Sequence, residues 1–208
     1  MINFLCPLCN SDSQPFYKED YYCCNNCKGI FVPQFKYLNA ENEKARYEEH
    51  NNDENDPAYQ KFVSPITQGV FNSFSKNHQG LDFGSGKSSS ISKVLRDQNY
   101  NIEKYDPFFY NFPNLLKSKY DYIAACEVIE HFNTPKKEFK LLFDLLNKNG
   151  VLYCMTSIYN KSIDFSSWYY KRDPTHVFIY QAETIFWIQK AFQFRKVLIE
   201  DRLIQFFK

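Results

Sequence analysis

The chain has 208 residues, of which 44 % are hydrophobic and 19 % are aromatic, and this much apolar side chain excludes a disordered protein. Its 25 basic and 24 acidic residues give a net charge of +1, which excludes a basic surface extending over the whole chain, although a local basic patch stays open. The sequence contains no apolar run of about 18 residues, and residues 1–5 lack the basic region and long apolar core of a signal peptide. We therefore expect a soluble, cytoplasmic protein without a membrane partner.

Five of the seven cysteines lie within the first 27 residues. Cys6 and Cys9 form one C-x-x-C pair, Cys24 and Cys27 form a second, and Cys23 adjoins the second pair. Two such pairs separated by a short spacer can place four thiolates tetrahedrally around one zinc ion. Disulfide bonds are the alternative, but they require an oxidising compartment. The pattern predicts a structural Zn²⁺ ribbon, and the repeated spacing favours Cys24 over Cys23 as a ligand.

The domain boundaries follow from changes in composition. Residues 1–33 form the predicted zinc ribbon, and residues 34–76 form a helical connecting or cap segment. Within that segment, the charged stretch Asn39–Asn55 predicts an exposed helix that frays at residues 51–53. Ala58–Phe74 carries apolar residues near helical spacing, so we expect it to pack on the main domain, residues 77–208.

The main domain shows apolar strand-like runs alternating with helix-like segments. The expected strands are Gly80–Phe83, Asn101–Tyr105, Tyr120–Cys126, Val151–Thr156, Phe194–Ile199 and Leu203–Phe207. The expected helices are Ser89–Gln98, Pro135–Asn147 and Ala182–Phe192, the second of them capped by Asn149 and Gly150. Alternation of this kind predicts an α/β fold: a mostly parallel, Rossmann-like sheet with an antiparallel hairpin from the two last strands at its edge.

A glycine turn follows the first of these strands. Asp82, Gly84 and Gly86 lie between that strand and the next helix, and glycines at such a junction let the backbone approach a nucleotide-like ligand. Asp106 follows Gly84 by about 20 positions, the distance at which an acid at the end of the second strand reaches ribose hydroxyls. An acid that only caps a strand before Pro107 is the alternative interpretation.

Three classes of ligand compete for this turn. A dinucleotide-binding turn needs a third glycine where the chain has Ser89, and a phosphate-binding loop needs a leading glycine where the chain has Leu81. S-adenosylmethionine carries no phosphate and needs only a close glycine turn and acids near its two ends. The turn therefore favours S-adenosylmethionine over NAD or ATP.

Four segments together resemble class I S-adenosylmethionine-dependent methyltransferases. They are Leu81–Gly86, Tyr105–Phe109, Cys126–Phe132 and Trp168–Val177. With the paired cysteines and residues 45–52, the chain is similar to a bacterial subgroup that carries an N-terminal four-cysteine zinc ribbon.

The resemblance implies roles for particular residues. Asp82, Gly84 and Gly86 would line the cofactor, with Asp106 on the ribose and Phe108 against the adenine. Glu127 also ends a strand at this edge and is expected to bind the cofactor. Many members place a helix, a strand and an adenine-contacting acid after the second strand, whereas residues 107–119 are too few for all three. We therefore expect a shortened sheet edge.

A cluster of acids and a histidine follows the third strand. Glu127, Glu130 and His131 occupy i, i+3 and i+4, so they would share one face of a helix. Together with His176 they could bind a second divalent cation, an arrangement similar to that of metal-dependent small-RNA 2′-O-methyltransferases and ubiquinone-pathway O-methyltransferases. Without a metal, Glu127 would cap the helix, Glu130 would be solvated, and His131 would be the first candidate for a general base, followed by His176. Phe165 and residues 168–170 form either a lid over the acceptor pocket or ordinary core packing.

The predicted function is transfer of a methyl group from S-adenosylmethionine to a hydroxyl of a small molecule or of a glycan or lipid precursor, with His131, Glu130 and His176 as catalytic residues. One alternative is an RNA methyltransferase that uses the ribbon for recognition, which the near-zero net charge disfavours. The other is a non-catalytic zinc-ribbon binding protein, which the retention of the glycine turn and its acids disfavours. The acceptor and the oligomeric state are left open.

Overall fold

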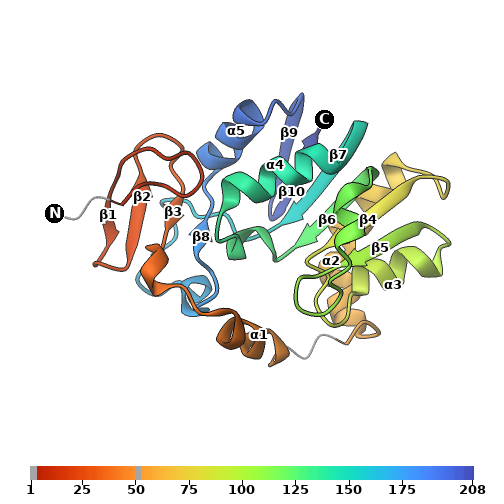
Figure 1. Ribbon diagram of the computed structural model, residues 1–208, viewed down its shortest axis with the longest axis horizontal. Helices are drawn as coiled ribbons and strands as arrows, with labels where there is room; N and C mark the ends of the chain where they lie inside the picture. The colour runs from red at the N-terminus through yellow and green to blue at the C-terminus, as the bar shows by residue number, and fades with distance from the viewer. Residues whose placement is uncertain (1–3, 50–52) are drawn as a thin grey trace.

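The computed structural model describes residues 4–49 and 53–208, and its centre is a six-stranded sheet (Figure 1). The strands are β4 (Gln79–Phe83), β5 (Asn101–Tyr105), β6 (Tyr120–Cys126), β7 (Leu146–Met155), β9 (Lys196–Glu200) and β10 (Leu203–Phe207), in the spatial order β5-β4-β6-β7-β10-β9. The first four strands run parallel, whereas β10 is antiparallel to both β7 and β9. The predicted Rossmann-like sheet with a C-terminal hairpin at its edge is confirmed.

Helices cover both faces of this sheet. On one face lie α2 (Pro57–Ser73) and α3 (Ser90–Asp97), whose buried apolar residues pack on β5, β6 and β7. On the other face lie α4 (Pro135–Leu145) and α5 (Ala182–Ala191), which pack on β4, β6, β7 and β10. The apolar residues of α2 recur at helical spacing and face the sheet, as their pattern predicts.

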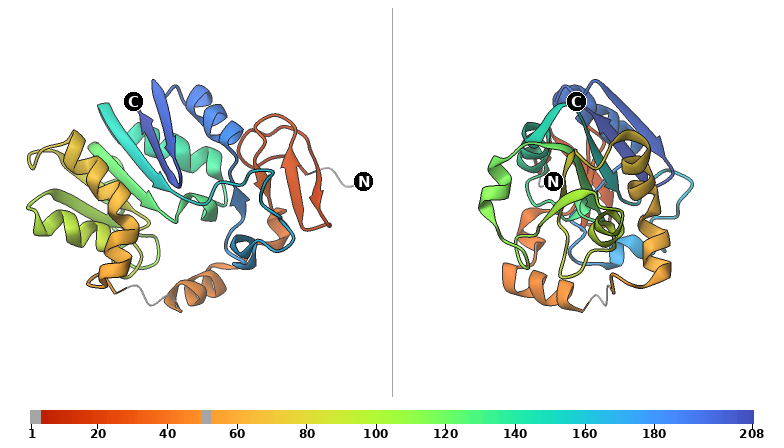
Figure 2. Two further views of the ribbon diagram at one scale, coloured as in Figure 1. Left: turned by 180° about the vertical axis from the view of Figure 1, so that it is seen from behind. Right: turned by 90° about the vertical axis from the view of Figure 1, so that its right-hand side faces the viewer.

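The cysteine-rich N-terminus forms a second, smaller sheet. It contains β1 (Ser13–Tyr17), β2 (Tyr21–Cys24) and β3 (Ile30–Phe31), and its fourth strand is β8 (Phe178–Ile179) from the main domain. A Cβ atom added at Gly29 would lie 2.2 Å from Cζ of Phe178, so only glycine lets the ribbon approach β8 this closely. The predicted boundary at residue 33 therefore separates two segments whose strands are hydrogen-bonded into one sheet. Figure 2 shows the ribbon at one end of the molecule and α3 at the other.

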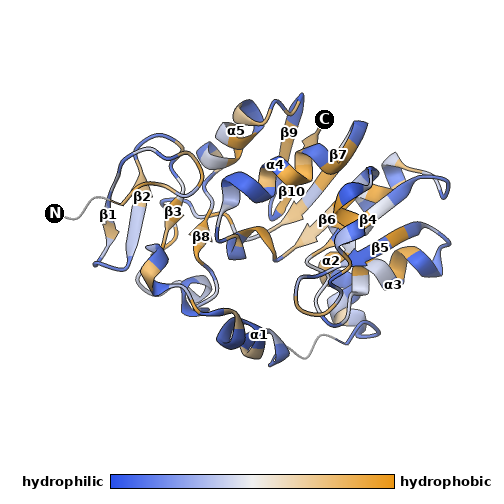
Figure 3. Cartoon of the chain, in the orientation of Figure 1, coloured by the Kyte–Doolittle hydropathy of each residue, from blue (hydrophilic) through white to orange (hydrophobic). Residues whose placement is uncertain are grey.

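A polar helix, α1 (Ala40–Glu48), connects the ribbon to the main domain. It begins at Asn39, whose side chain accepts a hydrogen bond from the Asn42 amide at 2.9 Å, as expected of an N-cap. Figure 3 shows it mostly in hydrophilic colours, and none of its residues is fully buried. The helix expected over residues 39–55 is shorter than predicted, because α1 ends at Glu48 and residues 53–55 are not helical. The expected fraying at residues 51 and 52 lies outside the described residues.

Two predictions about the loops have different outcomes. Between β5 and β6 there is only a 3₁₀ turn, Pro113–Lys117, so the expected shortened edge is confirmed. The predicted helix cap at Asn149 and Gly150 is wrong, because α4 ends at Leu145 and Leu146 already pairs with Tyr120 of β6. Asn149 has a φ of 66° and lies where the pairing of β6 and β7 is irregular. Its left-handed backbone conformation is therefore part of a bulge in β7.

Among the residues that the structure describes, no helix is both long and apolar enough to cross a membrane.

Candidate functional site

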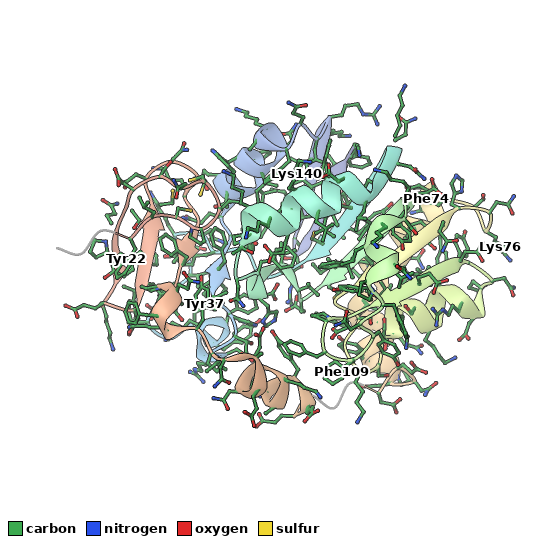
Figure 4. All side chains as sticks on the ribbon, in the orientation of Figure 1. Tyr22, Tyr37, Phe74, Lys76, Phe109 and Lys140 are labelled. Atoms are coloured by element: carbon green, nitrogen blue, oxygen red, sulfur yellow. The ribbon has the colours of Figure 1, made fainter. Side chains whose placement is uncertain are left out.

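A cavity of about 1320 Å³ opens at the carboxyl ends of β4, β5 and β6. Its wall includes most of the residues that the sequence singled out: Asp82, Gly84, Gly86, Asp106, Phe108, Glu127, His131 and His176. Phe109, which also lines it, is labelled in Figure 4 on the side of the main domain. The topology thus brings these residues together, because the carboxyl ends of parallel strands meet at one edge of the sheet.

The glycine turn is held by backbone hydrogen bonds. The amides of Gly84 and Ser85 both donate to the carbonyl of Tyr105, at 2.8 and 3.1 Å. Gly84 has a φ of 73°, and a Cβ atom there would lie 2.6 Å from Cγ2 of Val128. The left-handed backbone conformation and the clash with Val128 therefore both exclude a side chain at this position. Gly86 has a φ of 61°, and a Cβ atom there would meet only the Ser88 carbonyl oxygen, at 3.9 Å. The turn is therefore little crowded at Gly86, which lines the cavity.

Asp82 fastens this turn to the start of α3. Its carboxylate is buried and accepts hydrogen bonds from the hydroxyls of Ser89 and Ser92. Burial raises the pKa of Asp82, and the two hydroxyls oppose that effect. Ser89 also caps α3 by accepting from the Ser92 amide at 3.1 Å. Ser89, which breaks the dinucleotide motif, therefore has a structural role of its own.

Asp106 ties two loops together. One carboxylate oxygen accepts from the Gly86 amide at 2.9 Å, and the other accepts from the amides of Phe108 and Phe109 at 2.9 and 3.1 Å. Asp106 is 7 % exposed, and three of the roughly four acceptor sites of a carboxylate are thus used by backbone. Spacing alone identified the position but missed this scaffolding role, and the expected ribose contact stays a prediction.

Glu127 lies outside the predicted helix and pairs with an arginine from a distant turn. Its φ of 51° interrupts the chain between β6 and the 3₁₀ turn Ile129–His131, so it does not share a helix face with Glu130 and His131. Its carboxylate accepts a hydrogen bond from Nη2 of Arg202 at 2.6 Å. Burial and the neighbouring Glu130 raise the pKa of Glu127 to about 8, while Arg202 opposes the rise. The helix-cap alternative for Glu127 is also wrong.

Glu130 is fully buried beneath the cavity. It is 0 % exposed, so the interpretation of Glu130 as a solvated residue is wrong. One carboxylate oxygen accepts from the Tyr170 hydroxyl, and the other, Oε2, has no hydrogen-bond partner among the described residues. Burial raises the pKa of Glu130 to about 7, and the bond from Tyr170 opposes the rise. Glu130 does not line the cavity, so it can reach the reacting atoms only through a neighbour or a bound ion.

The two histidines lie next to each other, with ring centroids 4.8 Å apart. Nδ1 of His131 is 3.0 Å from the Thr175 carbonyl oxygen, and Nδ1 of His176 is 2.7 Å from the Tyr170 carbonyl oxygen. Carbonyl oxygens only accept, so each Nδ1 carries the proton and Nε2 is the basic atom of each neutral ring. Glu130, His131 and His176 each offer one ligand atom, all within 4.8 Å of one another. Glu127 is not part of this group.

Sequence reasoning missed Tyr47, the aromatic residue that α1 directs into the cavity. Its ring lies edge-on to His131 at 5.4 Å and is 5.7 Å from Phe108. Burial raises the pKa of Tyr47, so its hydroxyl stays protonated and donates to Glu43 at 2.8 Å. The signal was present in the sequence, because Tyr47 is the lone aromatic residue in an otherwise polar helix.

The aromatic residues expected to form either a lid or core packing divide into two groups. Tyr169 and Tyr170 line the cavity. Phe165 instead packs against the ribbon, with its ring 4.9 Å from that of Phe16 and 5.1 Å from that of Tyr21. Trp168 belongs to the same ribbon-side cluster. The chain uses these two aromatic residues to attach the ribbon to the main domain.

The four cysteines of the paired motifs converge in the ribbon. Sγ of Cys6 is 3.5 Å from Sγ of Cys27, and Sγ of Cys9 is 3.3 Å from Sγ of Cys24. Zinc–sulfur bonds of about 2.3 Å in a tetrahedron separate the sulfurs by about 3.8 Å, so the group fits a zinc ion. Cys23 is outside this group, and the described cysteines are all free thiols.

Comparisons with known proteins give a matching domain family and several similar folds. Residues 47–199 match the profile of a methyltransferase domain. Among solved structures, an O-methyltransferase family protein from Burkholderia thailandensis has a TM-score of 0.54 at 11 % identity, over 79 % of this chain and 61 % of that chain. A SAM-dependent methyltransferase from Archaeoglobus fulgidus has a TM-score of 0.53 at 18 % identity, over 68 % of this chain and 72 % of that chain.

A third similar structure is phosphoethanolamine N-methyltransferase 2 of Haemonchus contortus in complex with S-adenosyl-L-methionine, with a TM-score of 0.50 at 14 % identity, over 65 % of this chain and 38 % of that chain. The chain thus spans about three fifths of the Burkholderia protein and less of the Haemonchus enzyme. Comparison with curated sequences gives no match. At these identities the solved structures establish the fold, which is that of class I methyltransferases.

Proposed function

Because the chain belongs to the methyltransferase domain family, we propose that it transfers a methyl group from S-adenosylmethionine to a hydroxyl of a small molecule or of a glycan or lipid precursor. The observation that carries this proposal is the position of His131 and His176. They lie on the wall of the same cavity that the glycine turn borders, at the carboxyl ends of the parallel strands. A base and a cofactor turn that face one cavity are the arrangement that methyl transfer to a hydroxyl needs.

The turn side of the cavity fits the cofactor. Gly84 and Gly86 present backbone without side chains, and Phe108 offers an aromatic surface beside the Asp106 loop. When bound there, S-adenosylmethionine supplies a methyl group on an already activated sulfonium. The protein's contribution is therefore to position the acceptor in line and to exclude water from the cavity. Tyr47 also lines the cavity, with its ring edge-on to that of His131.

The histidine side of the cavity fits the acceptor. With Nδ1 of each ring committed to a carbonyl oxygen, Nε2 is the atom that can take the proton of an acceptor hydroxyl. His131 is the first candidate for this role, because it lies just after β6, whose carboxyl end borders the cavity. The carboxyl group of Glu130 is buried next to the two histidines.

Replacing His131 with alanine is expected to reduce methyl transfer about 100-fold, because a positioned general base typically contributes at least this much. The measurement is transfer of radiolabelled methyl from S-adenosylmethionine into a small-molecule extract, with total RNA assayed in parallel. We expect label in the small-molecule fraction. His78→Ala is the matched control, because His78 bonds only within the 75–78 turn, among the described residues. Label appearing in RNA, or full activity of the His131 variant, would contradict the proposal.

A second divalent cation is a further candidate feature of the same site. Glu130, His131 and His176 offer one carboxylate and two imidazole ligands, and Oε2 of Glu130 is buried without a hydrogen-bond partner among the described residues. Such a ligand set suits a transition-metal ion, whose chemistry would be to orient and acidify the acceptor hydroxyl.

This cation site predicts different effects for two neighbouring acids. Glu130→Gln is expected to weaken Mn²⁺ binding about tenfold or more, because a buried carboxylate ligand is lost. Glu127→Gln should weaken Mn²⁺ binding by only about threefold or less, because Glu127 is outside the three-residue group and acts on it through its charge, which Arg202 partly offsets. Mn²⁺ titration followed by electron paramagnetic resonance makes the measurement. If neither variant changes Mn²⁺ binding, the cluster is not a cation site.

The ribbon is proposed to be a structural zinc module. Its four thiols fit the ion, and its sheet continues into β8, which immediately follows the His176 loop. A closed four-thiolate site leaves no open coordination position for chemistry. The ribbon therefore acts on the reaction by holding the segment that carries His176.

A further inference from the structure

A second hollow lies between the ribbon and the loop that carries His176. It has a volume of about 330 Å³ and shares two wall residues, Asp173 and His176, with the main cavity. The other wall residues include Tyr17, Lys18 and Lys36 from the ribbon side and Lys171 from the loop. Because Asp173 and His176 border both cavities, the hollow adjoins the histidine side of the main cavity.

The hollow carries an excess of positive charge. Three lysines and two aspartates line it: Lys18, Lys36, Lys171, Asp20 and Asp173. Both aspartates have cationic partners already, since Asp20 pairs with Lys36 and Asp173 pairs with Arg46 at 2.8 Å. Although burial acts in the opposite direction, hydrogen bonds from Thr175 and Arg46 lower the pKa of Asp173 to about 2, so it stays ionised and engaged.

The two remaining lysines are held on one aromatic ring. Nζ of Lys18 lies 5.4 Å and Nζ of Lys171 lies 5.5 Å from the ring centroid of Tyr17. Neither lysine has an ion-pair partner in the described part of the chain. The hydroxyl of Tyr21 donates to the Lys171 carbonyl at 3.1 Å, which fixes the loop to the ribbon. Residues far apart in the sequence thus present two ammonium groups at one hollow.

From this arrangement we infer that the hollow binds a phosphate or diphosphate group of the methyl acceptor, so that the acceptor is a phosphorylated small molecule. Lysine binds phosphate as a point charge, and a hollow of this size is at the lower end of the range for small-ligand sites. The inference rests on the proposed function, because it places the acceptor's hydroxyl at His131 and its anionic end between Lys18 and Lys171. Since Tyr17 and Lys18 belong to the ribbon, the ribbon would then take part in acceptor recognition.

Inorganic pyrophosphate is the probe, titrated into the zinc-loaded full chain and followed by calorimetry. We expect Lys18→Gln/Lys171→Gln to weaken pyrophosphate binding about tenfold, because each solvent-accessible lysine–phosphate contact contributes about threefold. The matched control is Lys148→Gln/Lys190→Gln, which removes the same charge from two exposed lysines that do not line either cavity. This control should bind pyrophosphate within about twofold of the wild type.

Three outcomes would overturn the inference. The first is absence of pyrophosphate binding to the wild type, and the second is equal pyrophosphate affinity of the two double variants. The third is binding of a short RNA oligonucleotide at least about tenfold tighter than pyrophosphate and dependent on Lys18 and Lys171, which would assign the hollow to RNA. S-adenosylmethionine binding is measured in the same samples. If S-adenosylmethionine still binds but the pyrophosphate experiment fails, only the inference about the hollow is wrong. If S-adenosylmethionine does not bind, the proposed function is wrong.

Discussion

Replacing Cys24 with serine is expected to remove zinc from the protein, whereas replacing Cys23 is expected to leave zinc in place. Elemental analysis should find about one zinc ion per wild-type chain, the same in Cys23→Ser, and close to none in Cys24→Ser. The physical reason is geometric. Sγ of Cys24 lies 3.3 Å from that of Cys9 within the four-thiol group, and Cys23 is outside the group.

Zinc loss should also destabilise the main domain. Closed zinc sites contribute several kcal/mol to folding, so the Tm of Cys24→Ser should fall by at least about 10 °C. The ribbon shares a sheet with β8 and packs its aromatic residues on Phe165 and Ile179, so its unfolding exposes part of that core. Equal zinc content in the two serine variants would show that the ion is held in another way.

Replacing Asp106 with alanine is expected to abolish S-adenosylmethionine binding and to lower the free energy of unfolding by about 4 kcal/mol or more, since hydrogen bonds to a charged group contribute about 1.5–3 kcal/mol each. Asp106 accepts from Gly86, Phe108 and Phe109, so its loss frees the glycine turn and the next loop together. Urea unfolding and calorimetry with S-adenosylmethionine make the two measurements.

Asp97→Ala is the matched control for this prediction. Asp97 pairs with Lys93 at 2.6 Å on an exposed helix surface, and such a pair contributes about 0.5 kcal/mol or less. The control should therefore bind S-adenosylmethionine as the wild type does. Normal cofactor affinity in the Asp106 variant would mean that the turn does not depend on this carboxylate and that the proposed cofactor site is misplaced.

The sheet and the positions of the site were predictable from sequence because they depend on local patterns. Asp82 lies one residue before the end of β4, and Asp106 and Glu127 directly follow β5 and β6. Parallel strands bring such carboxyl ends together. The paired C-x-x-C spacing likewise placed Cys24, and not Cys23, in the thiol group. These features need only a few consecutive residues to be recognised.

The partners of the site residues were not predictable, because they come from distant segments. Arg202 reaches Glu127 from the β9–β10 turn, and Tyr170 reaches Glu130 from a loop 40 residues along the chain. The pairing of β3 with β8 involves two residues on each strand, too few for a pattern to show. Glu127 was placed on a helix by its spacing, but its φ of 51° breaks that periodicity.

Calorimetric titration of the wild-type, zinc-loaded chain with S-adenosylmethionine, NAD and ATP shows which ligand the glycine turn binds. We expect one binding site for S-adenosylmethionine with a Kd between about 1 µM and 1 mM, the usual range for an enzyme and its substrate. NAD and ATP should give no binding heat at the same concentrations, because the turn lacks the third glycine at Ser89 and the leading glycine at Leu81. Binding of NAD or ATP without binding of S-adenosylmethionine would contradict the assignment of this chain as a methyltransferase.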